Sequence, residues 1–269
     1  MSIVTVSRGS FSGGKMLAEC LARRLGYRCI DRDVIIRKAA AWGVSENDLR
    51  EALEKPPAFL GHSAHTKYIY LAFIQSALAD EVKEGKVIYH GLAGHLLLKG
   101  APHVLRVRII APLDVRIGMM QDLTKYNRKD AIAHIQKMDQ DRRKWTQFLY
   151  GVDWGDPSLY DIVLNLEHMT IDKACDVICS MLIGGTYEFT PQCRQAVHDL
   201  ALASRVRAHL AQDPATSDLE LEVVAHEGSV SVSGEVLGPD QAKEIRRIAR
   251  LVPGVTGVHM DELTLAVRF

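Results

Sequence analysis

The sequence has few cysteines, no net charge and no long apolar run, and each absence excludes a class of protein. Five cysteines occur in 269 residues, and no two of them form a CxxC pair. The odd number and the scattered positions are typical of a protein from a reducing compartment, and they argue against a disulfide-bonded secreted domain. Lysine plus arginine equals aspartate plus glutamate at 33 each. This balance argues against capture of nucleic acid through bulk charge.

No targeting or membrane-spanning segment is visible. The first residues, MSIVTVSRG, lack a charged region followed by a long apolar run, so no signal peptide is predicted. No stretch is long and apolar enough to span a bilayer. We therefore expect a cytoplasmic protein. Cys175 and Cys179 lie four residues apart on an expected helix. They could share a face and bind a metal, but we interpret them as two small buried side chains.

The alternation of short apolar strands with helices predicts the fold of the first part of the chain. Such alternation favours an α/β fold with a parallel sheet in three layers, helices covering both faces. The strands are expected at 3–6, 28–31, 87–89, 104–111 and 162–164. The helices are expected at 17–25, 68–83, 112–123, 128–150 and 171–182. Residues 33–67 read as helical pieces, interrupted by Pro56-Pro57 and Gly61, that lie over a site.

A boundary near residue 188 predicts a domain over 1–187 and a smaller one over 190–269. The second part should contain a helix over 194–211, a hairpin that turns at Glu227-Gly228, a helix over 240–251 and a strand near 263–267. This is a small α+β unit of order αββαβ. Its 8 basic and 11 acidic residues, counted from Thr190, leave it slightly acidic. With Gly184-Gly185 as a hinge, we expect it to be separable from the first domain.

The strongest chemical signal is a loop that fits the phosphate-binding pattern GxxxxGK between a strand and a helix. Its glycines let backbone N–H groups converge on phosphate oxygens, and the helix N-terminus adds partial positive charge. Lys15 is expected to reach the β- and γ-phosphates of ATP, whereas Met16 stands where Ser or Thr normally binds Mg²⁺. A glycine-rich turn without a ligand is the alternative. The residues expected to bind the cofactor are Gly9, Ser10, Phe11, Ser12, Gly13, Gly14, Lys15 and Met16.

The order of several motifs over residues 1–183 resembles the cytidylate-kinase-like family. The loop is followed by a helix that reads LAxxLAxxLG and by Asp31-Arg32-Asp33. The remaining motifs are Ala111-Pro112-Leu113 with Arg116, Asp139 and Arg142, and Trp154-Gly155-Asp156-Pro157 before Tyr160-Asp161 and Asn165.

The resemblance implies ATP-dependent phosphoryl transfer, with Mg²⁺, to a small acceptor such as CMP or dCMP. Asp31, at the end of the second strand, would face the acceptor, because ligands bind at the carboxyl ends of parallel strands. Arg116 and the lid-like pair Arg142 and Arg143 would neutralise charge on the transferring group. The alternative for Asp31 is a helix N-cap. For Arg142 and Arg143 it is a solvated helix face.

Three departures from the family pattern suggest weak catalysis. The family usually reads Gly-Arg after the third strand, and this chain has Gly91-Leu92. Met16 and the bulky Phe11 also depart from the family's loop. A nucleotide sensor that hardly turns over is therefore a second hypothesis, and a small-metabolite kinase is a third. His90 and His95 are interpreted as packing or hydrogen-bonding groups, and Trp154 as a core residue.

Residues 194–268 resemble a BON domain. The resemblance is carried by the segment from Glu227 to Val236, by Ala242 to Ala249, and by Pro253-Gly254-Val255 with Val258. BON domains are associated with binding membranes or proteins. The acidic excess here disfavours anionic lipid, so a protein partner, self-association or a regulatory ligand is expected, and no catalysis.

Overall fold

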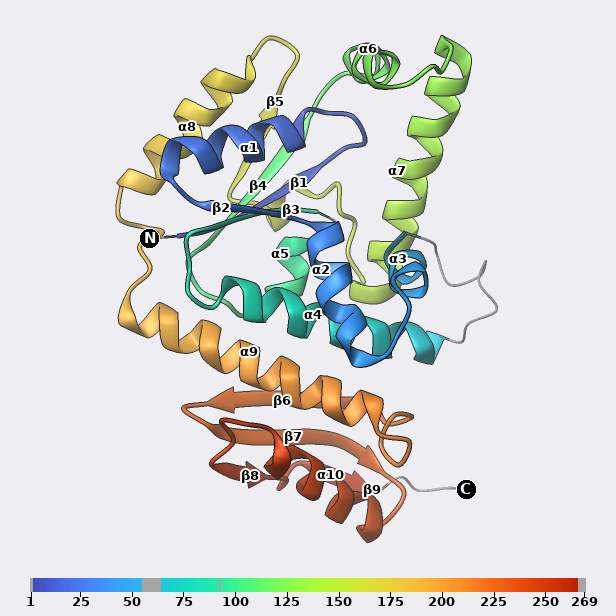
Figure 1. Cartoon of the computed structure of the whole chain (residues 1–269), viewed down its shortest axis with the longest axis vertical. Helices are drawn as coiled ribbons and strands as arrows, with labels where there is room; N and C mark the ends of the chain where they lie inside the picture. Colours follow the sequence, from blue (N-terminus) through green and yellow to red (C-terminus); the bar gives the residue numbers. More distant parts are fainter. Residues whose placement is uncertain (1, 55–63, 92, 266–269) are drawn as a thin grey trace.

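A five-stranded parallel sheet forms the centre of the first part of the chain (Figure 1). The structure is a computed structural model, and it describes residues 2–54, 64–91 and 93–265. The strand order is β2-β3-β1-β4-β5, and in the register Ile3 lies beside Val87 on one side and Val104 on the other. The strands are β1 (Ile3–Arg8), β2 (Arg28–Asp31), β3 (Val87–His90), β4 (Val104–Ile110) and β5 (Ile162–Asn165).

Helices cover both faces of this sheet, as the three-layer prediction required. On one face α1 (Gly14–Leu25) and α8 (Ile171–Ile183) pack on the sheet through Leu17, Leu21 and Ile178. On the other face the core includes residues of α2, α3, α4, α5 and α7. Those helices are α2 (Arg32–Ala39), α3 (Glu46–Glu54), α4 (Ala64–Val82), α5 (Gly94–Leu97) and α7 (Arg128–Tyr150). The hairpin of α6 (Leu113–Leu123) and α7 stands beside the carboxyl edge of the sheet (Figure 1).

Every strand and long helix expected in the first part is present, with ends that differ by a few residues. Among the described residues of this part, three short elements were not predicted: α5 and the 3₁₀ turns Ala40–Trp42 and Pro157–Leu159. Each is only three or four residues long, too short for a hydrophobic period to show. The expected breaks at Pro56-Pro57 and Gly61 lie outside the described residues.

The C-terminal part consists of two helices packed on a small sheet. The helices α9 (Pro191–Gln212) and α10 (Pro239–Leu251) share one core with the sheet. The strands are β6 (Leu221–His226), β7 (Ser229–Val236), β8 (Gly257–His259) and β9 (Leu263–Leu265). The order αββαβ was therefore incomplete, because β8 pairs with the first half of β7 and β9 with the second. Three residues without alternation gave β8 no sequence signal.

Helix α9 belongs to both parts of the molecule. It runs between α4 and β6 (Figure 1). Val197 and Ala208 are fully buried in the core of the first part, whereas Leu202, Val206 and Leu210 belong to the C-terminal core. Helix α4 is correspondingly buried nearly all round, at Leu71 to Ile74 and Ala77 to Ala79. The two parts are thus joined by a shared apolar helix.

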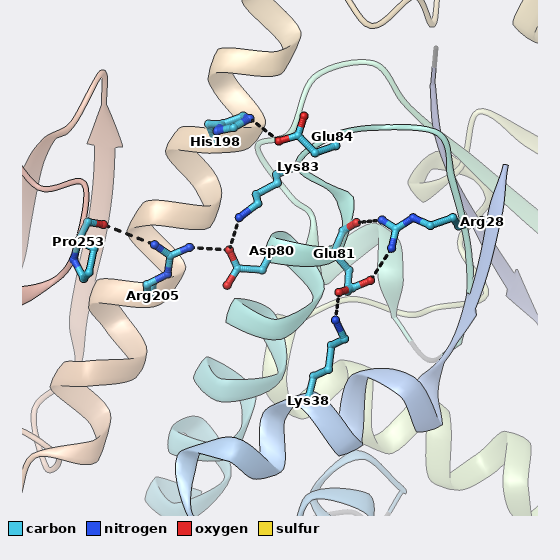
Figure 2. Close-up of polar contacts among 9 residues, drawn as sticks. All are labelled: Arg28, Lys38, Asp80, Glu81, Lys83, Glu84, His198, Arg205 and Pro253. Carbon is cyan, nitrogen blue, oxygen red and sulfur yellow. Dashed lines mark hydrogen bonds and ion pairs between the residues drawn. The ribbon is translucent and has the colours of Figure 1, made fainter.

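The acidic end of α4 adds a polar junction between the parts (Figure 2). Asp80 accepts from Arg205 of α9 at 2.6 Å, and the same guanidinium donates to the carbonyl of Pro253 at 3.4 Å. On the opposite side, Glu81 accepts from Arg28 of β2 at 2.8 Å and pairs with Lys38 of α2. The end of α4 therefore connects the C-terminal part with β2 and α2.

Candidate nucleotide-binding site

The loop between β1 and α1 is folded as a compact turn at the carboxyl edge of the sheet. Gly13 adopts a left-handed conformation, with φ 81°, and is the N-cap of α1. A Cβ there would lie 3.0 Å from Leu166, so both space and backbone favour glycine. The fully buried Ser12 donates its hydroxyl to the carbonyl of Gly9 at 2.9 Å. The loop thus presents the first N–H groups of α1 at the strand ends, a geometry that suits an anion.

Phe11 ties this loop to the lid-like hairpin. It has a positive φ of 57° and packs against the small core between α6 and α7. That core consists of Ile117, Met120, Ala131 and Ile135. The bulky residue that departs from the family pattern is therefore a contact between the loop and the hairpin.

Asp139 of α7 links the loop to Arg116 of α6. Its carboxylate accepts from the backbone N–H of Ser10 at 3.2 Å and from the hydroxyl of Ser10 at 3.1 Å. It also accepts from Arg116 at 2.6 Å, while Nε of Arg116 donates to the carbonyl of Ser10 at 2.7 Å. Arg116 lies against Gly9, where a Cβ would be 3.4 Å from its guanidinium carbon. This arrangement holds Arg116 at the start of the loop.

Three further arginines gather at the same edge. Arg142 of α7 donates to the carbonyl of Arg8 at 3.1 Å, and Arg8 is the last residue of β1. The pKa of Arg142 is lowered to about 10, chiefly by burial; Asp139 opposes this shift, and Arg8, Arg32 and Arg116 add to it. Burial and then Arg32 lower the pKa of Arg8. Such a set of cations favours a ligand with several negative charges, and guanidinium groups match phosphate oxygens.

Asp31 and His90 lie side by side at the ends of β2 and β3. Asp31 is the N-cap of α2 and accepts from the backbone N–H of Val34 at 2.9 Å. The capping alternative is therefore realised, and it leaves the carboxylate at the strand edge. Burial, followed by the charge of Arg8, lowers the pKa of His90 to about 4, so its ring is neutral near pH 7.

Lys15, Met16 and Arg143 are more exposed than the other predicted residues. The Lys15 side chain is 64% exposed, with Nζ 3.8 Å from Glu19. Arg143 is 66% exposed and 3.6 Å from Asp153, so the structure does not bring it to the loop with Arg142. Leu92 lies outside the described residues.

The residue after Lys15 does not provide a ligand for Mg²⁺. Met16 is 55% exposed, and Mg²⁺ takes oxygen ligands. Among residues 2–54, 64–91 and 93–265 there is no group of three His, Cys, Asp or Glu residues that could hold a metal ion. We assign no protein ligand to Mg²⁺. Nor is any helix in these ranges long and apolar enough to cross a membrane.

Sequence reasoning missed Arg8 and Arg32 as site residues, although Arg32 belongs to the motif Asp31-Arg32-Asp33 and Arg8 directly precedes the loop. Arg8 ends the first strand directly before the loop, and Arg32 follows the end of the second. The rule that ligands bind at the carboxyl ends of parallel strands could have found both.

The glycine loop at the strand ends, the parallel sheet and the surrounding arginines define a P-loop α/β protein of the nucleotide-binding class. A sequence profile of the Cytidylate kinase-like family matches residues 3–168, and this chain belongs to that family. A profile of the BON domain matches residues 198–266.

Curated relatives and solved structures agree with this assignment. A protein named cytidylate kinase from Thermococcus kodakarensis is 26% identical over 177 residues, covering 65% of this chain and 85% of the relative. Another, from Ignicoccus hospitalis, is 27% identical over 188 residues, 68% of this chain and 100% of the relative. The crystal structure of an uncharacterized protein from Eubacterium ventriosum has a TM-score of 0.55 at 19% identity, over 68% of this chain and 98% of that one. That structure supports the fold alone.

Proposed function

We propose that this protein transfers the γ-phosphoryl group of ATP to a nucleoside monophosphate, with CMP and dCMP as the first acceptors to test. The observation that carries the proposal is that Arg8, Arg32, Arg116 and Arg142 gather at the edge of the sheet where the glycine loop begins α1. The curated relatives named cytidylate kinase support the choice of acceptor.

In this reaction the bond between the γ-phosphorus and the β–γ bridging oxygen of ATP breaks, and a bond to a phosphate oxygen of the acceptor forms. The N–H groups at the start of α1 and Lys15 would hold the donor phosphates. Arg116 and Arg142 would neutralise charge on the transferring group, because such catalysis consists mostly of positioning and electrostatic stabilisation. Arg143 would act only if the hairpin brought it inward. Mg²⁺ would enter with ATP and neutralise phosphate charge.

The acceptor would lie near Asp31, beyond the carboxyl ends of β2 and β3. There it would face Arg8 and Arg32, whose positive charges suit its monophosphate. The neutral ring of His90 would add no charge at this edge.

A panel of ribo- and deoxyribonucleoside monophosphates with ATP and Mg²⁺, monitored through ADP release, tests the reaction. Lys15→Ala should weaken ATP binding at least tenfold, or ~1.4 kcal/mol, in a calorimetric titration. Lys99→Ala, an exposed lysine of the loop after α5, is the matched control and should leave affinity unchanged. Equal ATP affinity of Lys15→Ala and the wild type would contradict the assignment of the loop.

A nucleotide sensor is the second candidate, and the exposed Met16 is the observation that favours it. Tight ATP binding without ADP release on any acceptor would support it. Restoring the family's arginine by Leu92→Arg should then raise turnover, since one arginine on the transferring group contributes up to ~10³-fold. The C-terminal BON domain would in either case bind a protein partner, a second copy or a regulatory ligand.

A further inference from the structure

Arg108 is a buried arginine of β4 that the proposed mechanism does not use. Its side chain is 9% exposed. Its guanidinium carbon lies 4.4 Å from the ring centroid of Trp154 and 5.3 Å from that of Tyr160. Within the described part of the chain no carboxylate lies at ion-pair distance from it. Burial of a charge without an ion pair is costly, so the contacts that Arg108 does make must compensate.

Those contacts all go to the segment between α7 and β5. Nη1 of Arg108 donates to the carbonyl of Trp154 and lies 3.1 Å from the hydroxyl of Tyr160. The Tyr160 hydroxyl donates to the same carbonyl at 2.8 Å and lies 3.4 Å from the hydroxyl of Ser7. Two donors thus fix the backbone of Trp154, and the guanidinium fixes its indole. Trp154 is 5% exposed.

The same indole also contacts Arg142. The guanidinium carbon of Arg142 lies 5.7 Å from the Trp154 ring centroid, within the range of a cation–π interaction. The guanidinium of Arg142 makes only one hydrogen bond among the described residues, to the carbonyl of Arg8. The indole is therefore one of the two contacts that define where this guanidinium lies beside the loop.

We propose that Arg108 is a positioning residue: it fixes Trp154, and the indole of Trp154 in turn holds the guanidinium of Arg142 at the phosphate-binding loop. This inference rests on the proposed function for the role of Arg142. Arginine suits the task because its planar group stacks on a ring and donates to two oxygens at once. Lysine is a point charge without a planar face, and methionine keeps the length of the side chain without a donor.

The role predicts a specific kinetic pattern. Arg108→Met should lower kcat at least tenfold, equivalent to ~1.4 kcal/mol, with the KM for ATP within about twofold of the wild type. The kcat of Arg108→Lys should lie between that of Arg108→Met and that of the wild type. If Arg108 acts through Arg142, adding Arg108→Met to Arg142→Lys should lower kcat no further. Arg106→Met, which removes an arginine from the same strand that pairs with Asp161 at 2.6 Å, is the matched control and should keep kcat.

A spectroscopic readout tests the geometry without turnover. The chain has three tryptophans, so a ¹H–¹⁵N spectrum has three indole signals, and Trp154→Phe assigns the relevant one. Arg108→Met, Arg108→Lys and Arg142→Lys should each displace the Trp154 signal, while the fully buried Trp145 keeps its position. Arg106→Met should displace neither.

The outcomes separate this inference from the proposed function. No ADP release by the wild type on any acceptor would refute the proposed function, and the indole signals would still test the contacts of Arg108. An unmoved Trp154 signal in the Arg108 or Arg142 variants would overturn the inference. So would a further loss of kcat in the double variant, or an equal loss in Arg106→Met.

Discussion

Arg205 of α9 reaches the carboxylate of Asp80 at the end of α4 at 2.6 Å (Figure 2). The two side chains are 27% and 36% exposed, so the pair is partly shielded from solvent. It lies between the BON domain and the helix whose next residue, Glu81, pairs with Lys38 of α2. The BON domain is therefore connected, through the end of α4, with β2 and α2.

Breaking this pair should loosen the attachment. Arg205→Met also removes the bond to the Pro253 carbonyl, and we expect a loss of about 1 kcal/mol of unfolding free energy in denaturant titrations. Arg246→Met, an exposed arginine of α10, is the control. Equal stability of both variants at low ionic strength would show that the pair contributes nothing measurable.

Removing the BON domain should destabilise the first part of the chain. A chain ending at Thr186 lacks α9, which buries Val197 and Ala208 in the core of the first part and covers α4. The sequence suggested a separable unit, but exposing an apolar helix surface favours aggregation. We expect a lower melting temperature and increased light scattering. A soluble truncated chain that melts with the full chain would show that α9 is dispensable.

Asp139 should stabilise the fold and hold Arg116 in place. Asp139→Ala removes the acceptor of the Ser10 N–H, the Ser10 hydroxyl and Arg116, and Ser10 is 2% exposed. A buried donor left without an acceptor costs about 1–3 kcal/mol. We expect a loss in that range by chemical denaturation, together with weaker ATP binding. Asp122→Ala on α6, whose residue is exposed, should change neither.

His95 should make stability depend on pH. Burial, followed by Arg106 and Arg108, lowers its pKa from 6.5 to about 4, and it packs on Tyr160 with ring centroids 4.7 Å apart. Because the unfolded state binds the proton more readily, the stability that this group supports is complete above pH 6.5 and falls as the pH drops toward 4.

The loss of unfolding free energy that protonation of His95 causes over this pH range amounts to at most about 3 kcal/mol. His95→Phe keeps a ring beside Tyr160 and cannot titrate, so its stability should fall less steeply between pH 6.5 and 4 in thermal melts. His168→Phe, at a 92% exposed side chain, is the control. Parallel curves for wild type and His95→Phe would contradict the lowered pKa.

The sequence by itself determined the elements whose pattern is local. The apolar run of β1, the glycines and Lys15 of the loop, and the helical spacing of Leu17 and Leu21 lie within one stretch of chain, so sterics and periodicity predict them. The alternation in β6 and β7 around Glu227-Gly228 likewise predicts a hairpin. The order of motifs then sufficed to indicate the family.

Only the tertiary structure decided which residues meet. Residues 8, 32, 116 and 142 come from four separate segments, and the strand order of the sheet, with the α6–α7 hairpin, brings them to one edge. The direction of Arg143 away from the loop and the sharing of α9 between two cores also depend on packing between distant elements. Apolar residues on every side of a helix, as in α4, indicate that the helix is buried. That α9 is the helix which covers α4 follows only from the assembled fold.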